Sequence, residues 1–164
     1  MRDVLDDVHR RWSAGETVGL GTVVATFSSA PRAPGASMVV ASDGTVAGSV
    51  SGGCVEGAVY ELAQEVVAER KPVLQRYGVT DDDAFAVGLT CGGIIDIYVQ
   101  PVDRESMPEL GDVVSSVRGG EPVAMVTIIE HPHEGLVGEH MVVWPDRYLG
   151  AEAASVIGRA GAWE

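Results

Sequence analysis

The two cysteines of this chain are the residues best suited to chemistry, because each stands beside a pair of glycines. Cys54 follows Gly52-Gly53, and Cys91 precedes Gly92-Gly93. Paired glycines leave no side chain between a turn and a ligand. A thiolate at the start of a helix is stabilised and can bind a metal or carry sulfur. Both cysteines are therefore candidate ligating or catalytic residues.

The stretch around Cys54 reads as the end of a strand, a glycine turn and the start of a helix, and the chain is organised around it. The helix is predicted because apolar residues then recur at helical spacing, namely Val55, Ala58, Val59, Leu62 and Val66. The N–H groups of Ser51, Gly52 and Gly53 are expected to face outward at the helix start and to cradle a phosphate or another anion. Glu56 is either a base near this site or an acidic residue that complements the helix dipole.

Other readings of these residues stay open. Each cysteine can be a small buried residue, and the pair can form a disulfide if their Cα atoms lie within about 7 Å. Arg32 lies in a loop with two prolines. Its guanidinium is a candidate for donating paired hydrogen bonds to a phosphate or to an oxygen of a heterocycle, and the alternative is an ordinary surface arginine. His131, His133 and His140 lack accompanying ligands at metal-site spacing. The Asp81-Asp82-Asp83 run resembles no calcium loop and reads as solvated.

Composition narrows the class of protein. The chain has 164 residues, 46% of them hydrophobic and 21 of them glycine, which suits an ordered α/β or α+β protein. A net charge of −13 argues against nucleic acid or an anionic membrane as a partner. Neither a signal peptide nor a membrane-spanning run is visible, so a cytoplasmic location is expected, where thiols stay reduced. Two cysteines are too few for an iron–sulfur cluster.

Periodicity and turn residues predict the elements that hold these groups in place. The alternation of elements, with hairpin signals such as Asp43-Gly44, predicts a mixed, partly antiparallel sheet with helices packed on it. Gly158-Arg159-Ala160-Gly161 is not a dinucleotide fingerprint, so no Rossmann domain is expected. Helices are expected from Val4 to about Gly15, and over 55–70, 107–117 and 151–157, with a helical turn over 81–86; strands are expected over 18–27, 37–41, 45–50, 72–77, 94–100, 123–130 and 136–144.

Three motifs in this order resemble the N-terminal domain of the XdhC/CoxI family. They are Ser28-Ser29-Ala30-Pro31-Arg32-Ala33-Pro34-Gly35-Ala36, then Gly48-Ser49-Val50-Ser51-Gly52-Gly53-Cys54-Val55-Glu56, then Gly88-Leu89-Thr90-Cys91-Gly92-Gly93. The resemblance covers residues 1–102. It leaves residues 103–164 as a continuation of the same domain, or as a linker towards the C-terminal Rossmann domain that many members have.

The family's members are accessory factors of molybdenum hydroxylases such as xanthine dehydrogenase. The resemblance implies binding of the molybdenum cofactor, help with its sulfur ligand, and delivery to the apo-enzyme. It implies a site formed by Arg32, Ser51, Gly52, Gly53, Glu56, Gly92 and Gly93, with Cys54 and Cys91 as ligands of the molybdenum or as carriers of sulfur. The cofactor, molybdopterin or its cytosine dinucleotide form, would be cargo. A cysteine desulfurase is an expected partner, and a homodimer is compatible with the resemblance.

Three functions follow from these residues. In the first, the chain is a maturation chaperone that holds the cofactor and has no catalytic activity of its own. In the second, it is a sulfur transferase that carries a persulfide on one cysteine. In the third, it is a docking or regulatory domain whose acidic surface binds a partner without any cofactor. The first function is the main prediction. A persulfide on one cysteine would indicate the sulfur transferase. A docking role would survive replacement of both cysteines by serine.

Overall fold

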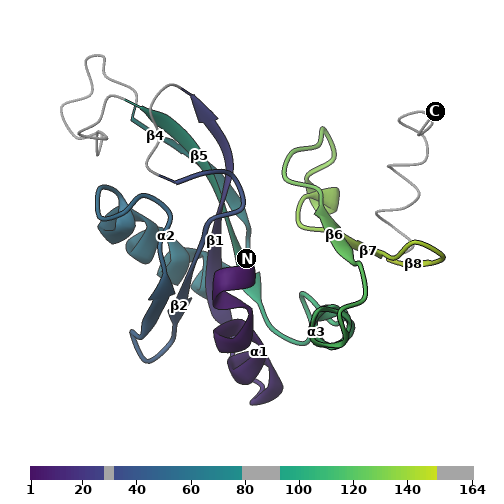
Figure 1. The fold of residues 1–164 in the computed structure, drawn as a ribbon. Helices are drawn as coiled ribbons and strands as arrows, with labels where there is room; N and C mark the ends of the chain where they lie inside the picture. Colours follow the sequence, from purple (N-terminus) through teal and green to yellow (C-terminus); the bar gives the residue numbers. More distant parts are fainter. Residues whose placement is uncertain (28–31, 79–92, 151–164) are drawn as a thin grey trace. The chain divides into compact units, whose positions relative to one another are not determined.

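The computed structural model describes residues 1–27, 32–78 and 93–150. The chain divides into two compact units, Met1–Ser106 and Met107–Glu164. Within the described residues, the first unit contains a five-stranded sheet and the second a three-stranded sheet (Figure 1). The predicted α+β class, with helices packed on a partly antiparallel sheet, is confirmed, and the strand pairs of both sheets are antiparallel.

The sheet of the first unit has the strand order β3-β2-β1-β5-β4. The long central strands β1 and β5 pair along their whole length, with a bulge between Val23 and Ala25. The elements of this unit are the 3₁₀ helix η1 (Arg2–Val4), α1 (Leu5–Ser13), β1 (Val18–Phe27), β2 (Ser37–Ala41), β3 (Val46–Gly48), α2 (Glu56–Glu69), β4 (Val73–Tyr77) and β5 (Ile94–Val102).

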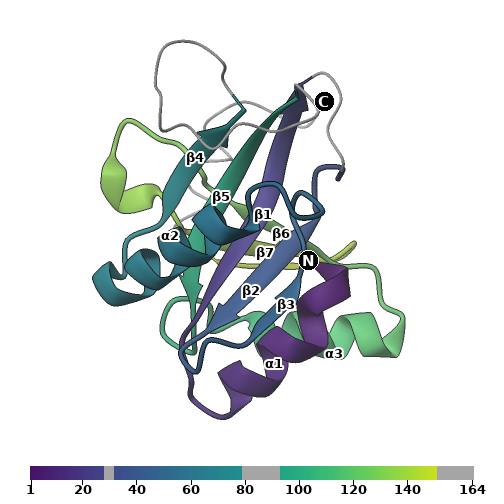
Figure 2. The same cartoon turned by 90° about the vertical axis from the view of Figure 1, so that its left-hand side faces the viewer.

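Helix α2 lies across one face of this sheet (Figure 2). Two glycines of β1 let the helix approach closely, because a Cβ on Gly19 would lie 2.7 Å from the Cβ of Ala63, and one on Gly21 would lie 3.1 Å from Val59. Since Gly19 faces a later turn of α2 than Gly21 does, the helix runs antiparallel to β1. Its N-terminus therefore points towards the end of the sheet at which β1 finishes.

The core between α2 and the sheet is aliphatic. Side chains of β5 alternate between the two faces, so Ile95, Ile97 and Val99 pack beneath α2 while Asp96 and Tyr98 lie on the other face. The other side chains of this core are Val23, Met38, Val40, Val50, Val55, Val59, Ala63, Val66 and Tyr77. Helix η1 and helix α1 pack against β1 and β2 and bury Val4 and Val8.

The second unit pairs a short helix with a three-stranded sheet of order β6-β7-β8. Buried Val113, Val142 and Trp144 form its core, and the indole N–H of Trp144 donates a hydrogen bond to Ser116 Oγ at 2.7 Å. The elements of this unit are α3 (Leu110–Gly119), β6 (Ala124–Thr127), the 3₁₀ helix η2 (Glu134–Leu136), β7 (His140–Val143) and β8 (Tyr148–Leu149).

Most predicted elements of the first unit are present, and the errors concentrate in the second. The strand expected over 136–144 begins only at His140, because residues 134–136 form η2 instead. The expected strand over 123–130 is shorter, and β8 was not predicted. Two-residue strands carry too little alternation to be recognised. The expected helical segments over 81–86 and 151–157 lie outside the described residues.

Candidate functional site

The residues that flank or belong to the three sequence motifs, so far as the structure describes them, lie at one end of the five-stranded sheet. Phe27, which precedes the first motif, pairs with Ile94, which follows the third. The second motif begins at the same end, because β3 finishes beside the start of β2 and the Ser49 amide donates to the Ser37 carbonyl at 3.0 Å. The N-terminus of α2 points to this end as well. The fold thus gathers segments that are far apart in the sequence.

The turn before α2 does hold an anion, and the anion is the side chain of Glu56. Its carboxylate accepts hydrogen bonds from the amides of Ser51, Gly52 and Gly53 at 2.9, 3.0 and 2.8 Å. The hydroxyls of Ser49 and Ser51 donate to the same carboxylate at 2.7 and 2.5 Å. Both glycines have positive φ, which other residues adopt at a cost. While Glu56 is in place, these three amides are not available to a phosphate.

Ser51 Oγ caps the start of the helix. It accepts hydrogen bonds from the amides of Cys54 and Val55, at 3.0 and 2.9 Å, while its proton goes to Glu56. Amide groups at a helix start otherwise lack partners, and a serine hydroxyl is a preferred acceptor for them. Ser51 is buried, and Cys54 is partly exposed with its side chain packed against the core beneath α2. The network therefore fixes the backbone at Cys54.

The hydrogen bonds to Glu56 determine its charge. Burial favours the neutral acid, but the donors from Ser51, Ser49 and the turn amides outweigh burial and lower the pKa of Glu56 to about 2. The carboxylate is ionised at neutral pH and is a weak base. Of the two sequence-based readings of Glu56, the geometry thus favours a structural anion at the helix start over a proton acceptor.

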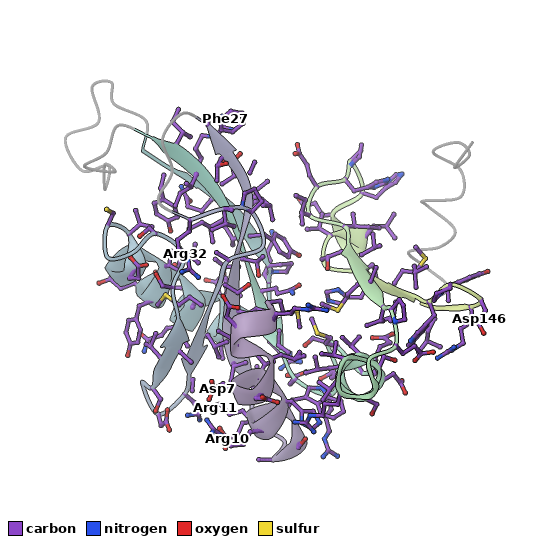
Figure 3. The ribbon with its side chains drawn as sticks, in the orientation of Figure 1. Asp7, Arg10, Arg11, Phe27, Arg32 and Asp146 are labelled. Atoms are coloured by element: carbon purple, nitrogen blue, oxygen red, sulfur yellow. The ribbon has the colours of Figure 1, made fainter. Side chains whose placement is uncertain are left out.

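Arg32 lies apart from this network. Its Nη2 is 3.4 Å from an Asp3 carboxylate oxygen, and its side chain is 40% exposed (Figure 3). It lines an open hollow of about 550 Å³ formed by the chain start and residues 32–36. A single long ion pair holds the guanidinium only loosely. Arg32 stays a predicted ligand-binding residue.

The other predicted site residues are only partly visible. Cys91 and Gly92 lie outside the described residues, and Gly93 is buried just before β5. The separation of the two cysteines is therefore not described. Their joint role stays a prediction.

A polar group that sequence reasoning missed lies near the same end of the sheet. Arg76 on β4 forms two hydrogen bonds to Asp96 on β5, and its guanidinium lies over the ring of Phe27, 5.2 Å from the centroid. The signal in the sequence is a single aspartate, Asp96, inside an apolar strand. The opposite charge, 20 residues away, becomes its partner only through the strand register.

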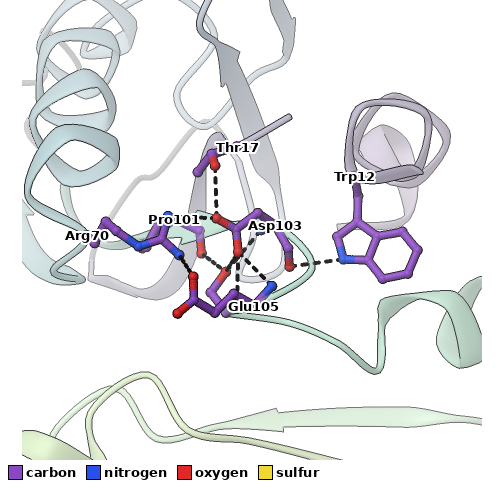
Figure 4. Close-up of polar contacts among 7 residues, drawn as sticks. Trp12, Thr17, Arg70, Pro101, Asp103 and Glu105 are labelled. Carbon is purple, nitrogen blue, oxygen red and sulfur yellow. Dashed lines mark hydrogen bonds and ion pairs between the residues drawn. The ribbon is translucent and has the colours of Figure 1, made fainter. Parts of the chain in front are cut away.

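The opposite end of the sheet carries a second buried carboxylate, Asp103 (Figure 4). It accepts hydrogen bonds from Arg70 Nη1 at 2.8 Å, Thr17 Oγ1 at 2.9 Å and the Ser106 amide at 2.8 Å. Burial raises its pKa, but Arg70, Ser106 and Thr17 together hold the pKa of Asp103 well below its ordinary value. Trp12 donates to its carbonyl oxygen at 3.0 Å. This cluster joins the end of α2 to β1 and β5, and its role is structural.

Two further classes of site are absent from the part of the chain that the structure describes. No set of three or more histidine, cysteine, aspartate or glutamate side chains there is arranged to hold a metal ion. No helix in the described ranges is long and apolar enough to cross a membrane.

The fold and the turn define an α+β protein whose sheet ends in a cysteine-bearing glycine turn. Residues 11–78 match the model of the XdhC and CoxI family. The resemblance to this family seen in the sequence is thereby confirmed, and this part of the chain belongs to it.

Similar proteins support the same assignment. A protein of Bacillus subtilis named as a probable xanthine dehydrogenase subunit is 30% identical over 138 residues, which are 82% of this chain and 42% of that protein. The molybdenum cofactor insertion chaperone PaoD from Escherichia coli is 35% identical over 112 residues, 68% of this chain and 34% of that one. A crystal structure described as a xanthine dehydrogenase from Bacillus halodurans has a TM-score of 0.74 at 26% identity, covering 89% of this chain and 44% of that one. The chain thus spans less than half the length of these relatives.

Proposed function

We propose that this chain is an accessory protein that binds the molybdenum cofactor and assists its sulfuration and insertion into a xanthine dehydrogenase-type hydroxylase. The similarity to PaoD, a molybdenum cofactor insertion chaperone, carries this proposal. The family match over residues 11–78 supports it, because those residues include the whole turn from Ser49 to Glu56.

In this proposal the residues of the turn have different roles. Gly52 and Gly53 have open space where a Cβ would stand, so a large ligand can approach the backbone there. Cys54 is partly exposed beside them and supplies the soft sulfur that a molybdenum centre or a transferred sulfur atom requires. Glu56 keeps the turn rigid. In this proposal the Cys54 thiol contacts the cargo, and the turn amides contribute to an anion site only if Glu56 moves away.

Titration with the molybdenum cofactor tests this function. Cofactor released from a mature hydroxylase is added to the wild type, to Cys54→Ser and Cys91→Ser, and to Ser115→Ala as a control at an exposed position on α3. The bound pterin is then released from the protein and quantified by its fluorescence. We expect the wild type and the control to bind equally and Cys54→Ser to bind at least tenfold more weakly. A wild type that binds no cofactor refutes the proposal for this chain and favours the cofactor-free docking role.

The sulfur transferase alternative is tested separately. A cysteine desulfurase and L-cysteine are added, and the mass of each cysteine peptide is measured. In this reaction the Cys54 or Cys91 thiolate takes the terminal sulfur of the desulfurase persulfide, and the desulfurase cysteine is released as a thiolate. One added sulfur atom on either peptide favours the transferase. Unmodified peptides, together with cofactor binding, favour the chaperone.

A further inference from the structure

The start of the chain and the loop before β2 form an open hollow of about 550 Å³ on the first unit, which we call the Arg32 hollow. Its lining includes Arg2, Asp3, Arg32 and residues 33–36. It lies at the same end of the sheet as the glycine turn, because residue 36 directly precedes β2, and Ser37, the first residue of that strand, accepts a hydrogen bond from the Ser49 amide.

The backbone around the Arg32 hollow is held in place by contacts within the first unit. On one wall Val4 is buried, and a Cβ on Gly48 would lie 2.4 Å from one of its methyl groups, so η1 packs tightly on the sheet. On the other wall the amide of Gly35 donates to the Val23 carbonyl at 2.8 Å. The amino group of Met1 donates to the Gly35 carbonyl and joins the two walls. The arginine side chains of the hollow therefore start from a fixed backbone.

The protein's own carboxylates engage these two arginines only weakly. The Arg2 side chain has neither a hydrogen bond nor an ion pair within the part of the chain that the structure describes. Arg32 has one contact of 3.4 Å with a carboxylate oxygen of Asp3, whose side chain is 68% exposed. By comparison, an N–O distance of 3.0 Å or less is found in the ion pairs of Arg10, Arg11, Arg70, Arg76 and Arg147. Two guanidinium groups at one hollow are thus available to a ligand.

The charge of the chain makes these arginines informative. There are 24 acidic residues against 11 basic ones, so carboxylates are in excess for internal ion pairs. Of the described residues that line the hollow, only Asp3 is acidic. A phosphate monoester carries close to two negative charges at neutral pH, and a guanidinium binds it through paired N–H donors. Two arginines therefore match one such group in charge and in donors. The amides of the glycine turn already donate to Glu56 and do not compete for it.

We propose that the Arg32 hollow binds the terminal phosphate of a small molecule. Arg32 exchanges its long contact with Asp3 for paired hydrogen bonds to the phosphate, and Arg2 supplies the second positive charge. Asp3 opposes binding, because it competes for Arg32 and repels the anion. The phosphate of the molybdenum cofactor, that of a nucleotide and inorganic phosphate share this chemistry. The choice of the cofactor rests on the proposed function, whereas the phosphate site itself does not.

Three probes separate these sources: molybdenum cofactor released from a mature hydroxylase, cytidine monophosphate, and inorganic phosphate. Cytidine, which lacks the phosphate, is the ligand control. Each is titrated into Arg32→Gln, Arg2→Gln, Asp3→Asn and the wild type, all without added residues at the chain start. Arg10→Gln is the matched control, because it removes the same charge from an exposed arginine of α1 that does not line the hollow (Figure 3). Calorimetry measures the nucleotide and phosphate, pterin fluorescence measures the cofactor, and circular dichroism confirms folding.

We expect Arg32→Gln to weaken binding of the phosphate-bearing probes about tenfold or more, and Arg2→Gln to weaken it several-fold. Asp3→Asn should tighten binding about two- to fivefold, because the competing carboxylate is gone. Arg10→Gln should change it less than about twofold, because exposed charges that are distant from the ligand are screened by salt. Cytidine should not bind.

Cofactor binding that is equal in the wild type and in both hollow variants, Arg32→Gln and Arg2→Gln, overturns the phosphate site and leaves the proposed function standing. Arg32-dependent binding of cytidine monophosphate or inorganic phosphate without cofactor binding supports the site and removes the proposed function. Equal losses in Arg32→Gln and Arg10→Gln overturn the site, because they reflect net charge alone. Binding of none of the probes overturns both proposals.

Discussion

The hydroxyl and the amide of Ser51 both donate to the carboxylate of Glu56, so the turn before α2 is tied to the first residue of that helix. The same hydroxyl oxygen accepts from the amides of Cys54 and Val55. One carboxylate and one serine thus satisfy most of the polar groups of the turn. The position of Cys54 depends on residues that need not touch any ligand.

Replacing Glu56 tests this dependence. We expect Glu56→Gln to lower the free energy of unfolding by about 2 kcal/mol, because a neutral amide accepts fewer and weaker hydrogen bonds than the carboxylate does. Glu65→Gln, at an exposed position of the same helix, is the control and is expected to have almost no effect. Urea unfolding measures both. Equal stability of the two variants would show that the carboxylate is not what holds the turn.

Protonation of Glu56 at low pH should weaken its hydrogen bonds to the turn before α2. The native pKa of Glu56, about 2, lies below the ordinary value of 4.5. The carboxylate therefore contributes stability that is complete above about pH 4.5 and is lost as the pH falls towards 2. In Glu56→Gln this part of the acid dependence should be missing. A wild type and a variant whose stabilities fall in parallel over this range would contradict the assignment.

His140 gives a pH dependence in a different window. Burial lowers its pKa from 6.5 to about 4, and the neutral ring contacts Thr127 Oγ1 at 3.0 Å. Between pH 6.5 and 4 the unfolded chain binds the proton and the native chain does not, so stability falls with falling pH. We expect a loss of about 2 kcal/mol between pH 7 and 5. His140→Gln should remove this loss and His131→Gln should not, as measured by urea midpoints at the two pH values.

The close approach of α2 to β1 depends on Gly19. We expect Gly19→Ala to destabilise the first unit by about 2 kcal/mol, because the new methyl group would overlap the Cβ and carbonyl oxygen of Ala63. Gly57→Ala is the control, since nothing lies within 4 Å of the added Cβ, and alanine favours the helix by up to about 1 kcal/mol. Thermal unfolding should therefore move in opposite directions for the two variants. A neutral Gly19→Ala would mean that the helix relaxes away from the sheet.

We expect Asp103 to contribute more to the free energy of unfolding than Glu105, which also pairs with Arg70. Asp103→Asn removes the charge of a carboxylate that is 10% exposed and accepts hydrogen bonds from Arg70, Thr17 and Ser106, and we expect the free energy of unfolding to fall by about 2 kcal/mol. Glu105 also pairs with Arg70, but its side chain is 87% exposed, so Glu105→Gln should change stability by less than about 0.5 kcal/mol. Chemical denaturation distinguishes them. Similar losses in the two variants would contradict a structural role for the buried carboxylate.

Local sequence patterns are sufficient to predict much of the secondary structure of the first unit. The apolar spacing after Val55 predicted α2, and β-branched runs predicted β1 and β5, because helical and strand periodicities are properties of short segments. The paired glycines of the turn were recognised for the same reason, since only glycine adopts positive φ without strain. In the second unit the strands are short, and the residues that decide them, such as Ser116 and Trp144, meet only in the folded chain.

The family resemblance, the glycine turn and the placement of Cys54 at a helix start can all be predicted from local sequence patterns. That the Glu56 carboxylate occupies the anion site is visible only in the folded chain, because several amides must converge on one carboxylate before the site exists. The pairing of Arg76 with Asp96 beside Phe27 also requires the fold, since three different strands supply those side chains. Side chains that are distant in sequence become neighbours through strand register, which depends on the packing of the whole sheet.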